Sequence, residues 1–415
     1  MGHSSNPLFG DAVRSALSEL EGVQPIPEPL QVVERLKRVL AADVAREAAA
    51  LFALRLRARA KYPGHVPSYM TRRGLEQASA GPVADERARR VLATLPGALT
   101  LDATCGIGAD VLALARHGRA SATRVVAADH DPHLAACVRA NLDAAELPGH
   151  ALVADALRPA LRPEVVLLDP DRRVGERRSL DPERWSPTLS ASIEVTERCT
   201  GACIKLAPAF DPTLLKEPAR LPHGSTLRWV SLAGELAEVA LWTGALADAE
   251  DSASARPGRV AVCLDRRGGR AELRGEAEEV TALAPADLDR VAWLAEPDPA
   301  IIRAGLIGTV CRTEGLRPIA PESAYLGGDT PPRSPFVRAW RVLGSSSTDP
   351  KRVRALLGEH DVGPLTVKKR GHPDDAATLA RRLRGPGTRR GLLAIGRLER
   401  GHRAFLLQEQ AEGTS

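Results

Sequence analysis

The sequence has few aromatic residues and no long apolar run. Phe, Trp and Tyr together make up 3% of its 415 residues, and no stretch approaches the roughly 18 consecutive apolar residues that a membrane helix needs. Its first twenty residues have neither the basic start nor the apolar core of a secretory signal. We therefore expect a cytoplasmic protein without a membrane partner.

Cysteine is also sparse, with six residues scattered at positions 105, 137, 199, 203, 263 and 311. None of the spacings between them is that of a metal-ligand set, and so the sequence predicts no metal site. Most of the six fall within apolar segments. We expect reduced thiols with structural roles, as is usual in the cytoplasm.

Lysine is rare as well, because seven of the 57 cationic side chains are Lys and the rest are Arg. The formal net charge of +5 suits a polyanionic partner. Since the chain is also rich in Ala, Gly and Pro, coding bias would explain so many arginines equally well. Their clustering is more informative, although solvated helix faces would also produce some of these runs. The clusters lie at residues 72–73, 172–178, 368–370, 381–384 and 389–390.

The most informative stretch is LDATCGIGAD, residues 101–110, which joins the end of an apolar strand to a turn with two glycines. Gly106 and Gly108 lack the β-carbon that would keep a ligand away from the backbone. The helix predicted to follow directs its first N–H groups toward the same place. This pattern is typical of a nucleotide site, although glycines in such a turn can also serve packing alone.

Three successive strands of the predicted sheet end in an aspartate: Asp129, Asp155 and Asp169. In an open parallel sheet, ligands bind at the carboxyl ends of the strands, so we expect these side chains to meet at the glycine turn. The alternative is that each Asp only caps the helix that follows it. The parallel strands are predicted over residues 99–101, 125–128, 151–154 and 165–168, with helices over 109–117 and 133–144.

The residues around the turn disfavour a dinucleotide. Val111 occupies the position where a dinucleotide-binding turn has its third glycine, and Asp110 would repel a diphosphate at the start of the helix. The chain contains no phosphate-binding loop of the Gly-x-x-x-x-Gly-Lys type. A cationic nucleoside without phosphate is therefore favoured, and S-adenosylmethionine satisfies each condition. Its adenosine would lie near Asp129 and Asp155, and its ammonium and sulfonium near Asp102 and Asp110.

Residues 101–110, 126–132 and 169–173 together resemble the ordered motifs of class I methyltransferases. More narrowly, the chain resembles a bacterial group of RNA methyltransferases with a THUMP-like C-terminal domain, and this likeness extends to residues 70–78, 296–300 and 367–371. The resemblance implies a Rossmann-like fold, S-adenosylmethionine as the methyl donor, and a base in tRNA or rRNA as the acceptor. It leaves open which RNA and which atom is methylated.

By this resemblance, one set of residues would bind the cofactor. Its members come from the glycine turn and from the ends of the second and third strands. They are Asp102, Thr104, Cys105, Gly106, Gly108, Asp110, Asp129, His130, Asp155 and Ala156.

Methyl transfer requires that the acceptor atom be aligned with the methyl carbon and lose its proton where it has one. In the family, the residues after the fourth strand align the acceptor, and here they are Asp169, Pro170, Asp171 and Arg172. The second proline and the aromatic residue typical of enzymes that methylate exocyclic amines are absent, which disfavours that acceptor. We expect Asp169 to accept the proton or a hydrogen bond, and Arg172 to stack on a base or bind phosphate.

Lys205 is unusual because it interrupts an apolar strand predicted over residues 202–206. A buried lysine needs a carboxylate partner, and Asp169 is the candidate. Lys205 is therefore the third predicted catalytic residue. Cys199 and Cys203 lie close by, but their sequence context favours core thiols over a nucleophile that adds to a pyrimidine ring.

Four residues are expected to contact the substrate. Arg72 and Arg73 would face it from a short helix, although a solvated first turn is the alternative. Arg173 belongs to the basic cluster that follows the fourth strand. Trp185 would supply the missing stacking face, or would only anchor its own loop.

We predict an α/β methyltransferase domain over residues 98–284. Residues 1–27 would be a flexible leader, 28–97 a helical region, and 285–411 a small THUMP-like α+β domain. The elements expected within these bounds include helices at 30–59, 235–246 and 298–312, strands at 227–232 and 259–264, and a polar hinge at 266–285.

Two other functions remain open. The enzyme could methylate a small molecule or a protein, or the chain could be a cofactor-binding RNA-interaction protein without turnover. The sequence predicts no oligomeric state.

Overall fold

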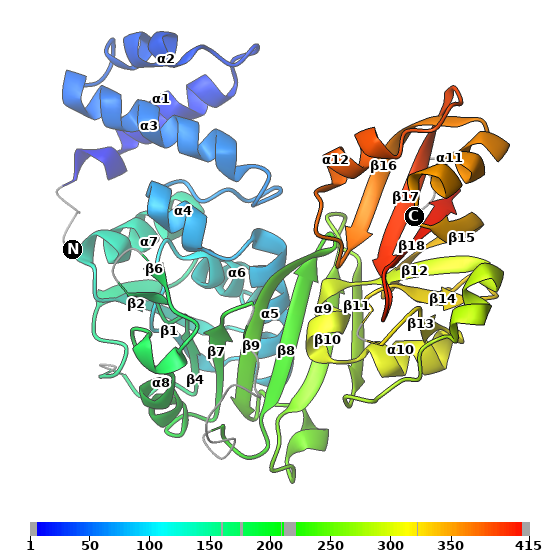
Figure 1. Ribbon diagram of the computed structural model, residues 1–415. Helices are drawn as coiled ribbons and strands as arrows, with labels where there is room; N and C mark the ends of the chain where they lie inside the picture. The colour runs from blue at the N-terminus through cyan, green and yellow to red at the C-terminus, as the bar shows by residue number, and fades with distance from the viewer. Residues whose placement is uncertain are drawn as a thin grey trace. The chain divides into compact units, whose positions relative to one another are not determined.

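The computed structural model, shown in Figure 1, describes residues 6–158, 161–174, 177–208, 210, 221–321 and 323–408. The chain divides into two compact units. The first comprises residues 1–232, 237–258 and 266–268. The second comprises residues 233–236, 259–265 and 269–415.

The first unit begins with helices that share one apolar core. A 3-10 turn at Pro7–Phe9 precedes α1 (Asp11–Glu21), α2 (Pro29–Leu36) and α3 (Ala42–Ala58). The predicted flexible leader is therefore wrong over α1, whose buried residues recur at helical spacing, at positions 13, 16, 17 and 20. The single helix predicted over residues 30–59 is in fact α2 and α3, and both contribute to the same core.

The rest of the first unit is an α/β sheet with helices packed against it. Among the strands of this unit the order is β8-β9-β7-β4-β1-β2-β3. Neighbouring strands from β3 to β7 pair in parallel, and β9 runs antiparallel to β7. Its five parallel strands lie where the sequence predicts them, and β8 and β9 form a hairpin beside β7. Its strands are β1 (Leu99–Asp102), β2 (Arg124–Asp129), β3 (His150–Val153), β4 (Val165–Leu168), β7 (Gly201–Leu206), β8 (Thr226–Leu232) and β9 (Glu235–Gly244).

The helices of this sheet follow the prediction closely around the glycine turn. The predicted helix over residues 109–117 is α6 (Ala109–His117), and α7 (Pro132–Ala144) begins one residue before the predicted start. The other helices are α4 (Arg72–Gln77), α5 (Gly81–Thr94) and α8 (Leu189–Thr196), and the short strands β5 (Arg173–Val174) and β6 (Arg177–Arg178) pair with each other. One apolar core joins α5, α6 and α7 to the sheet.

The helix predicted over residues 235–246 is wrong, because this segment is strand β9. Six consecutive residues of β9, from Glu238 to Thr243, are buried. A strand covered on both faces loses the alternation of polar and apolar residues, so periodicity cannot distinguish it from a buried helix. The turn before β9 indicates a strand rather than a helix, because Ala233 and Gly234 both have positive φ, as a two-residue hairpin turn requires.

The second unit is an α+β arrangement. Strands β10 (Gly258–Leu264) and β11 (Arg270–Gly275) form an antiparallel pair. The polar hinge predicted over residues 266–285 is therefore wrong over β11. A second sheet has the strand order β13-β14-β12-β15-β18-β17-β16. Its strands are β12 (Trp293–Pro297), β13 (Arg317–Pro318), β14 (Leu326–Gly328), β15 (Val337–Ser347), β16 (Val362–Arg370), β17 (Arg389–Arg397) and β18 (His402–Leu407).

The described residues of this unit also form a 3-10 helix at Pro285–Arg290 and the α-helices α9 (Pro299–Ala304), α10 (Ile307–Glu314), α11 (Pro350–Glu359) and α12 (Ala376–Arg382). The single helix predicted over residues 298–312 is divided, because Gly305 adopts φ 73° and ends α9. Within the described part of the chain, no helix has the length and apolar character needed to cross a bilayer.

Candidate cofactor and acceptor site

The two glycines of the turn between β1 and α6 have different surroundings. Gly106 and Gly108 adopt φ angles of 54° and 87°, which other residues rarely adopt. A β-carbon at Gly108 would press against Val138 of α7, at 3.0 Å from its Cγ2 atom. A β-carbon at Gly106 would meet nothing within 4 Å. Gly108 therefore serves packing, whereas Gly106 leaves open space beside the backbone for a ligand.

Asp129 lies against this open turn, as the sequence predicts. One carboxylate oxygen accepts a hydrogen bond from the Gly106 N–H at 3.0 Å, and the other accepts one from the Asp131 N–H at 3.0 Å. His130, which is largely exposed, places its Nδ1 atom 3.2 Å from Asp129. The turn and the end of β2 thus form a cradle with a carboxylate at its edge, which fits a nucleoside with ribose hydroxyls.

The side chains of Thr104 and Cys105, which were predicted to bind the cofactor, make contacts within the protein instead. The Thr104 hydroxyl accepts a hydrogen bond from the Asp169 N–H at 2.6 Å and so joins the ends of β1 and β4. The Cys105 side chain is buried in the apolar core, and its burial raises the pKa of the thiol well above the usual value. Cys105 can therefore offer a ligand its backbone but not a thiolate.

Asp155 follows β3 and is exposed, while Ala156 beside it is half-buried. The Asp155 carboxylate accepts a hydrogen bond from the Leu157 N–H at 2.9 Å. This contact closes a local turn rather than capping a helix, because no helix starts at residues 156–158. It leaves the second carboxylate oxygen available to a ligand at the end of β3.

Asp102 is buried at the end of β1, at the entrance to the turn. Burial raises the pKa of its carboxyl group to about 6, while the positive charge of Lys205 acts in the opposite direction. A cation that comes close to this buried carboxyl group would stabilise its ionised form and lower its pKa.

Lys205 bridges two carboxylates beneath the turn. Its Nζ atom lies 2.9 Å from Asp169 Oδ2 and 3.0 Å from Asp110 Oδ2. The pairing of Lys205 with Asp169 is the one that the sequence predicts. The second partner was expected to face the cationic groups of the cofactor. Asp110 instead has protein cations on both of its oxygens, because Arg87 of α5 binds the other one.

Arg87 extends this cluster of charges and was not predicted. Its side chain is 2% exposed and forms ion pairs with Asp110 and with Glu238 of β9. The signal lies in α5, where Arg87 occurs on the face that also carries the buried residues Ala84, Ala88 and Val91. An arginine on an apolar helix face must be paired with carboxylates in the interior.

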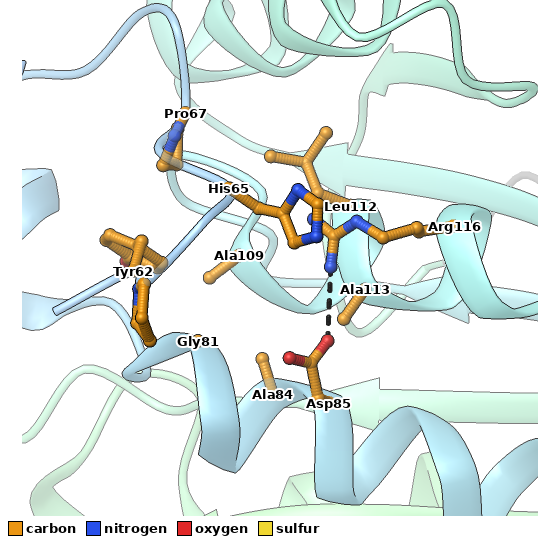
Figure 2. Close-up of a pocket in the computed structure, with 11 residues that line it drawn as sticks. Tyr62, His65, Pro67, Gly81, Ala84, Asp85, Ala109, Leu112, Ala113 and Arg116 are labelled. Carbon is orange, nitrogen blue, oxygen red and sulfur yellow. Dashed lines mark hydrogen bonds and ion pairs between the residues drawn. The ribbon is translucent and has the colours of Figure 1, made fainter. Parts of the chain in front are cut away.

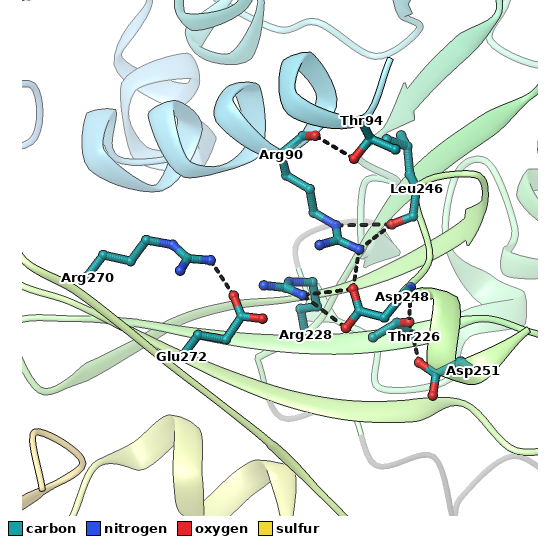
Figure 3. Close-up of polar contacts among 9 residues, drawn as sticks. All are labelled: Arg90, Thr94, Thr226, Arg228, Leu246, Asp248, Asp251, Arg270 and Glu272. Atoms are coloured by element: carbon teal, nitrogen blue, oxygen red, sulfur yellow. Dashed lines mark hydrogen bonds and ion pairs between the residues drawn. The ribbon is translucent and has the colours of Figure 1, made fainter. Parts of the chain in front are cut away.

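A second cluster fastens α5 to the sheet, as Figure 3 shows. Arg90 donates two hydrogen bonds to the Leu246 carbonyl, at 3.0 and 2.6 Å, and also pairs with Asp248. Arg228 of β8 lies 3.3 Å from both oxygens of the same carboxylate. The helix that presents Arg87 to Asp110 is therefore held at two positions one turn apart.

The segment after β4 contacts α4. The Arg73 guanidinium lies 2.8 Å from Asp171 Oδ2, whereas Arg72 pairs with Glu76 on its own helix and has a 78% exposed side chain. Arg172 and Arg173 are half-buried in the same segment. The Asp169 side chain is 38% exposed, so it remains accessible beside its partner Lys205.

Trp185 does not offer a stacking face. Its side chain is buried, at 3% exposed, and its indole N–H donates to the Ser179 carbonyl at 3.0 Å. The prediction of a substrate contact is therefore wrong, and the alternative of a loop anchor holds. A rare aromatic residue on a polar segment gives no signal that distinguishes these two roles.

Two further residues near Lys205 were not predicted. Lys61 donates a hydrogen bond to the Leu75 carbonyl at 2.6 Å, and burial together with the charge of Lys205 lowers its pKa to about 8. The Tyr62 hydroxyl is buried without a hydrogen-bond partner among the described residues, and burial raises the pKa of its phenol. The rarity of lysine was the available signal, since Lys61 is one of seven.

Tyr62 also lines a separate depression, shown in Figure 2, which encloses about 310 Å³ of space open to solvent. Its walls come from α5, α6 and the loop before α4. Two of its lining residues, Arg116 and Asp85, are 3.1 Å apart. None of the residues predicted to bind the cofactor is among those that line it. No group of three His, Cys, Asp or Glu side chains in the described ranges could hold a metal ion.

Comparison with known proteins agrees with this geometry. Two relatives, from two strains of Mycobacterium tuberculosis, are each described as an uncharacterized S-adenosylmethionine-dependent methyltransferase. Each is 34% identical over 334 residues, which cover 80% of this chain and 85% of the relative. The chain belongs to this methyltransferase family.

Two further comparisons concern the fold of this methyltransferase. A crystal structure from Porphyromonas gingivalis, of a protein assigned as a methyltransferase, matches 99% of this chain and all of its own, with a TM-score of 0.75 at 19% identity. Residues 337–409 match the family model described as THUMP domain-like. The predicted combination of a methyltransferase sheet with a THUMP-like C-terminal domain is thus confirmed.

S-adenosylmethionine is the cofactor of the family, and the turn fits it. The open space at Gly106 and the adjacent Asp129 suit its adenosine, because no phosphate has to be accommodated there. Asp102 suits a cationic group of its methionine part, since its carboxyl group is buried.

Proposed function

We propose that this methyltransferase transfers the methyl group of S-adenosylmethionine to a base in tRNA or rRNA. The observation that carries the proposal is the accessible Asp169 carboxylate, which Lys205 holds next to the glycine turn. The THUMP domain-like match and the arginine clusters support RNA as the acceptor.

Asp169 is the proposed acceptor of the proton, or of a hydrogen bond, from the target nitrogen. The bound cofactor supplies an activated methyl group, so the protein has to orient the acceptor and remove its proton. Lys205 holds the Asp169 carboxylate in position through their ion pair, at 2.9 Å. Asp110 and Arg87 in turn hold Lys205 in place from the interior.

Cofactor binding is proposed for the residues around the turn that remain available to a ligand. Asp129 and Asp155 would bind the ribose hydroxyls, and Asp102 the ammonium group. Gly106 would admit the cofactor to the backbone. Among the other predicted ligands, Gly108 and Thr104 shape the turn rather than touch the ligand.

RNA phosphates are the proposed partners of Arg72, Arg73, Arg172 and Arg173. These arginines come from α4 and from the segment after β4, and Arg73 links the two through Asp171. Guanidinium groups bind phosphate in a bidentate manner and can stack on bases. We also propose that the protein acts in the cytoplasm, a reducing compartment that suits its six free cysteines.

Nucleoside mass spectrometry of RNA from a deletion strain tests this function. We expect one methylated nucleoside to be missing, to return with the wild-type gene, and to stay absent with Asp169→Asn. Asp143→Asn, an exposed site on α7, is the matched control and should restore the nucleoside. If the deletion strain lacks no methylated nucleoside, RNA is not the acceptor.

The two alternative functions predict different outcomes in binding experiments. A methyltransferase for small molecules or proteins would bind S-adenosylmethionine but show no salt-dependent binding of RNA. An RNA-interaction protein without turnover would bind both, and the deletion strain would keep every methylated nucleoside.

A further inference from the structure

The short helix α4 lies between the two parts of the proposed active site. Its Gly74 packs against the glycine turn, because a β-carbon there would overlap the Cγ2 methyl group of Ile107. Its Arg73 reaches the segment after β4 through the 2.8 Å contact with Asp171. The helix therefore touches both the turn that binds the cofactor and the segment that aligns the acceptor.

Asn141 of α7 fixes the chain just before α4. The Tyr69 N–H donates to its Oδ1 atom at 2.6 Å, and its Nδ2 atom donates to the Tyr69 carbonyl at 2.8 Å. The same Nδ2 atom donates to the carbonyl of Ile107 at 3.1 Å. Asn141 is 1% exposed, so these three bonds are made away from water.

Two further contacts hold α4 in this position. The Thr71 hydroxyl caps the helix by accepting a hydrogen bond from the Gly74 N–H at 2.9 Å. Lys61 donates to the Leu75 carbonyl at 2.6 Å. Met70, Leu75, Ile107 and Ala109 belong to one apolar core with α1, α2 and α3. The glycine turn is thus part of the packing of the N-terminal helices as well as of the sheet.

We propose that Asn141 and Gly74 are positioning residues that join α4 to the glycine turn, so that cofactor binding orders α4 as one wall of the acceptor site. Ile107 of the turn makes both connections: its side chain packs against Gly74 of α4, and its carbonyl accepts the hydrogen bond from Asn141. A ligand that fixes the turn therefore also restricts α4. The part of this inference that concerns the acceptor rests on the proposed function, whereas the joining of α4 to the cofactor turn does not.

Hydrogen exchange with and without saturating S-adenosylmethionine tests the coupling. In the wild type, the cofactor should slow exchange in residues 72–77 by on the order of tenfold, in addition to residues 102–112. In Gly74→Ala, the added methyl group separates α4 from Ile107, and we expect protection by the cofactor to remain only in residues 102–112. The control is Gln77→Ala, an exposed site on the same helix, which should behave as the wild type.

A second change distinguishes positioning from general damage. Asn141→Ser breaks the connection at another point, because the shorter side chain cannot span the backbone groups of Tyr69 and Ile107, and it too should confine protection by the cofactor to residues 102–112. A merely structural role would instead predict that both variants also lose protection in residues 102–112. If Gly74→Ala does not fold, Asn141→Ser alone provides the test.

Two results would overturn the inference: exchange of α4 in the wild type that does not respond to the cofactor, or a full response retained in Gly74→Ala. Neither depends on the acceptor, since the experiment uses S-adenosylmethionine alone. A failure of RNA as the substrate would therefore leave this result standing, and a failure here would leave the RNA experiment unaffected.

Discussion

Asp102, Asp110 and Asp169 all lie near the glycine turn, yet their neighbours give them different roles. Asp110 is paired with Arg87 and Lys205, and Asp169 shares the same lysine while remaining accessible. Asp102 is buried at the end of β1, with a pKa of about 6. The sequence presents these three residues as equivalent acids beside a turn. Packing alone decides which of them is buried at the end of a strand, which has protein cations on both oxygens and which stays accessible.

If Asp102 binds a cationic group of the cofactor, as proposed, its raised pKa makes cofactor affinity depend on pH. A cation near this carboxyl group favours its ionised form, so binding should release a proton near pH 6 and weaken as the pH falls from 7 to 5. Calorimetric titration in buffers of different ionisation enthalpy would measure this proton release. In Asp102→Asn, affinity should be lower and its dependence on pH across this range should disappear. A wild type whose affinity is constant from pH 5 to 7 would contradict the role of Asp102.

The same group affects the stability of the protein without cofactor. The pKa of Asp102 in the folded protein is about 6, above the value of 3.8 in the unfolded chain. The contribution of this carboxyl group to the free energy of unfolding is therefore fully present below pH 4 and is lost as the pH rises through about 6. The shift corresponds to about 3 kcal/mol. Urea denaturation should show this loss in the wild type relative to Asp102→Asn.

At the scale of the elements, the sequence predicts best where a pattern is local. Strand β4 and helix α6 have the predicted bounds, since each is an apolar run that ends at a turn residue. The pairing of Lys205 with Asp169 was predictable because a lysine in a buried strand needs a carboxylate. Arg87 and Glu238 were not, because 151 residues separate them and only the folded sheet brings them together. Strand β9 was not predicted because burial on both faces removes its alternation.

The turn between β1 and α6 gives a prediction that separates its two glycines. Both have positive φ, so replacement by alanine strains the backbone by about 1 kcal/mol in each case. Gly106→Ala fills open space, and we expect it to reduce cofactor affinity much more than stability. Gly108→Ala presses on Val138 and should chiefly reduce stability. Thermal unfolding and calorimetric titration of both variants would measure this division.

The steric partner of Gly108 provides the control. Gly108→Ala and Val138→Ala combined should cost less stability than the sum of their separate losses, because the second change removes the methyl groups that the new β-carbon meets. Adding Val138→Ala should not restore cofactor affinity to Gly106→Ala. Equal losses of affinity in the two glycine variants would contradict the distinction between them.

At the scale of the whole molecule, the proposed cofactor site and the THUMP domain-like residues belong to different units. The glycine turn, the Lys205 cluster and α4 all belong to the first unit. The THUMP domain-like residues 337–409 belong to the second, together with three of the arginine clusters. In this second unit, Glu296 already binds Lys368 and Arg370, at 2.9 and 2.6 Å. The charge of that cluster is thus partly neutralised within the protein, whereas Arg389 and Arg390 are both exposed at the start of β17 and are the stronger candidates for RNA binding.

These two arginines allow function to be separated from coding bias. If they bind RNA phosphates, Arg389→Gln with Arg390→Gln should weaken RNA binding and reduce the slope of log affinity against log salt by about 0.7 for each phosphate that is no longer bound. Affinity for S-adenosylmethionine should not change. The matched control is Arg35→Gln with Arg38→Gln, which removes the same charge from exposed positions outside the predicted clusters. Filter binding across a range of salt concentrations would measure both slopes. Equal losses of affinity in the two double variants would mean that net charge alone attracts RNA, since a site defined by clustered arginines requires the β17 pair to matter more.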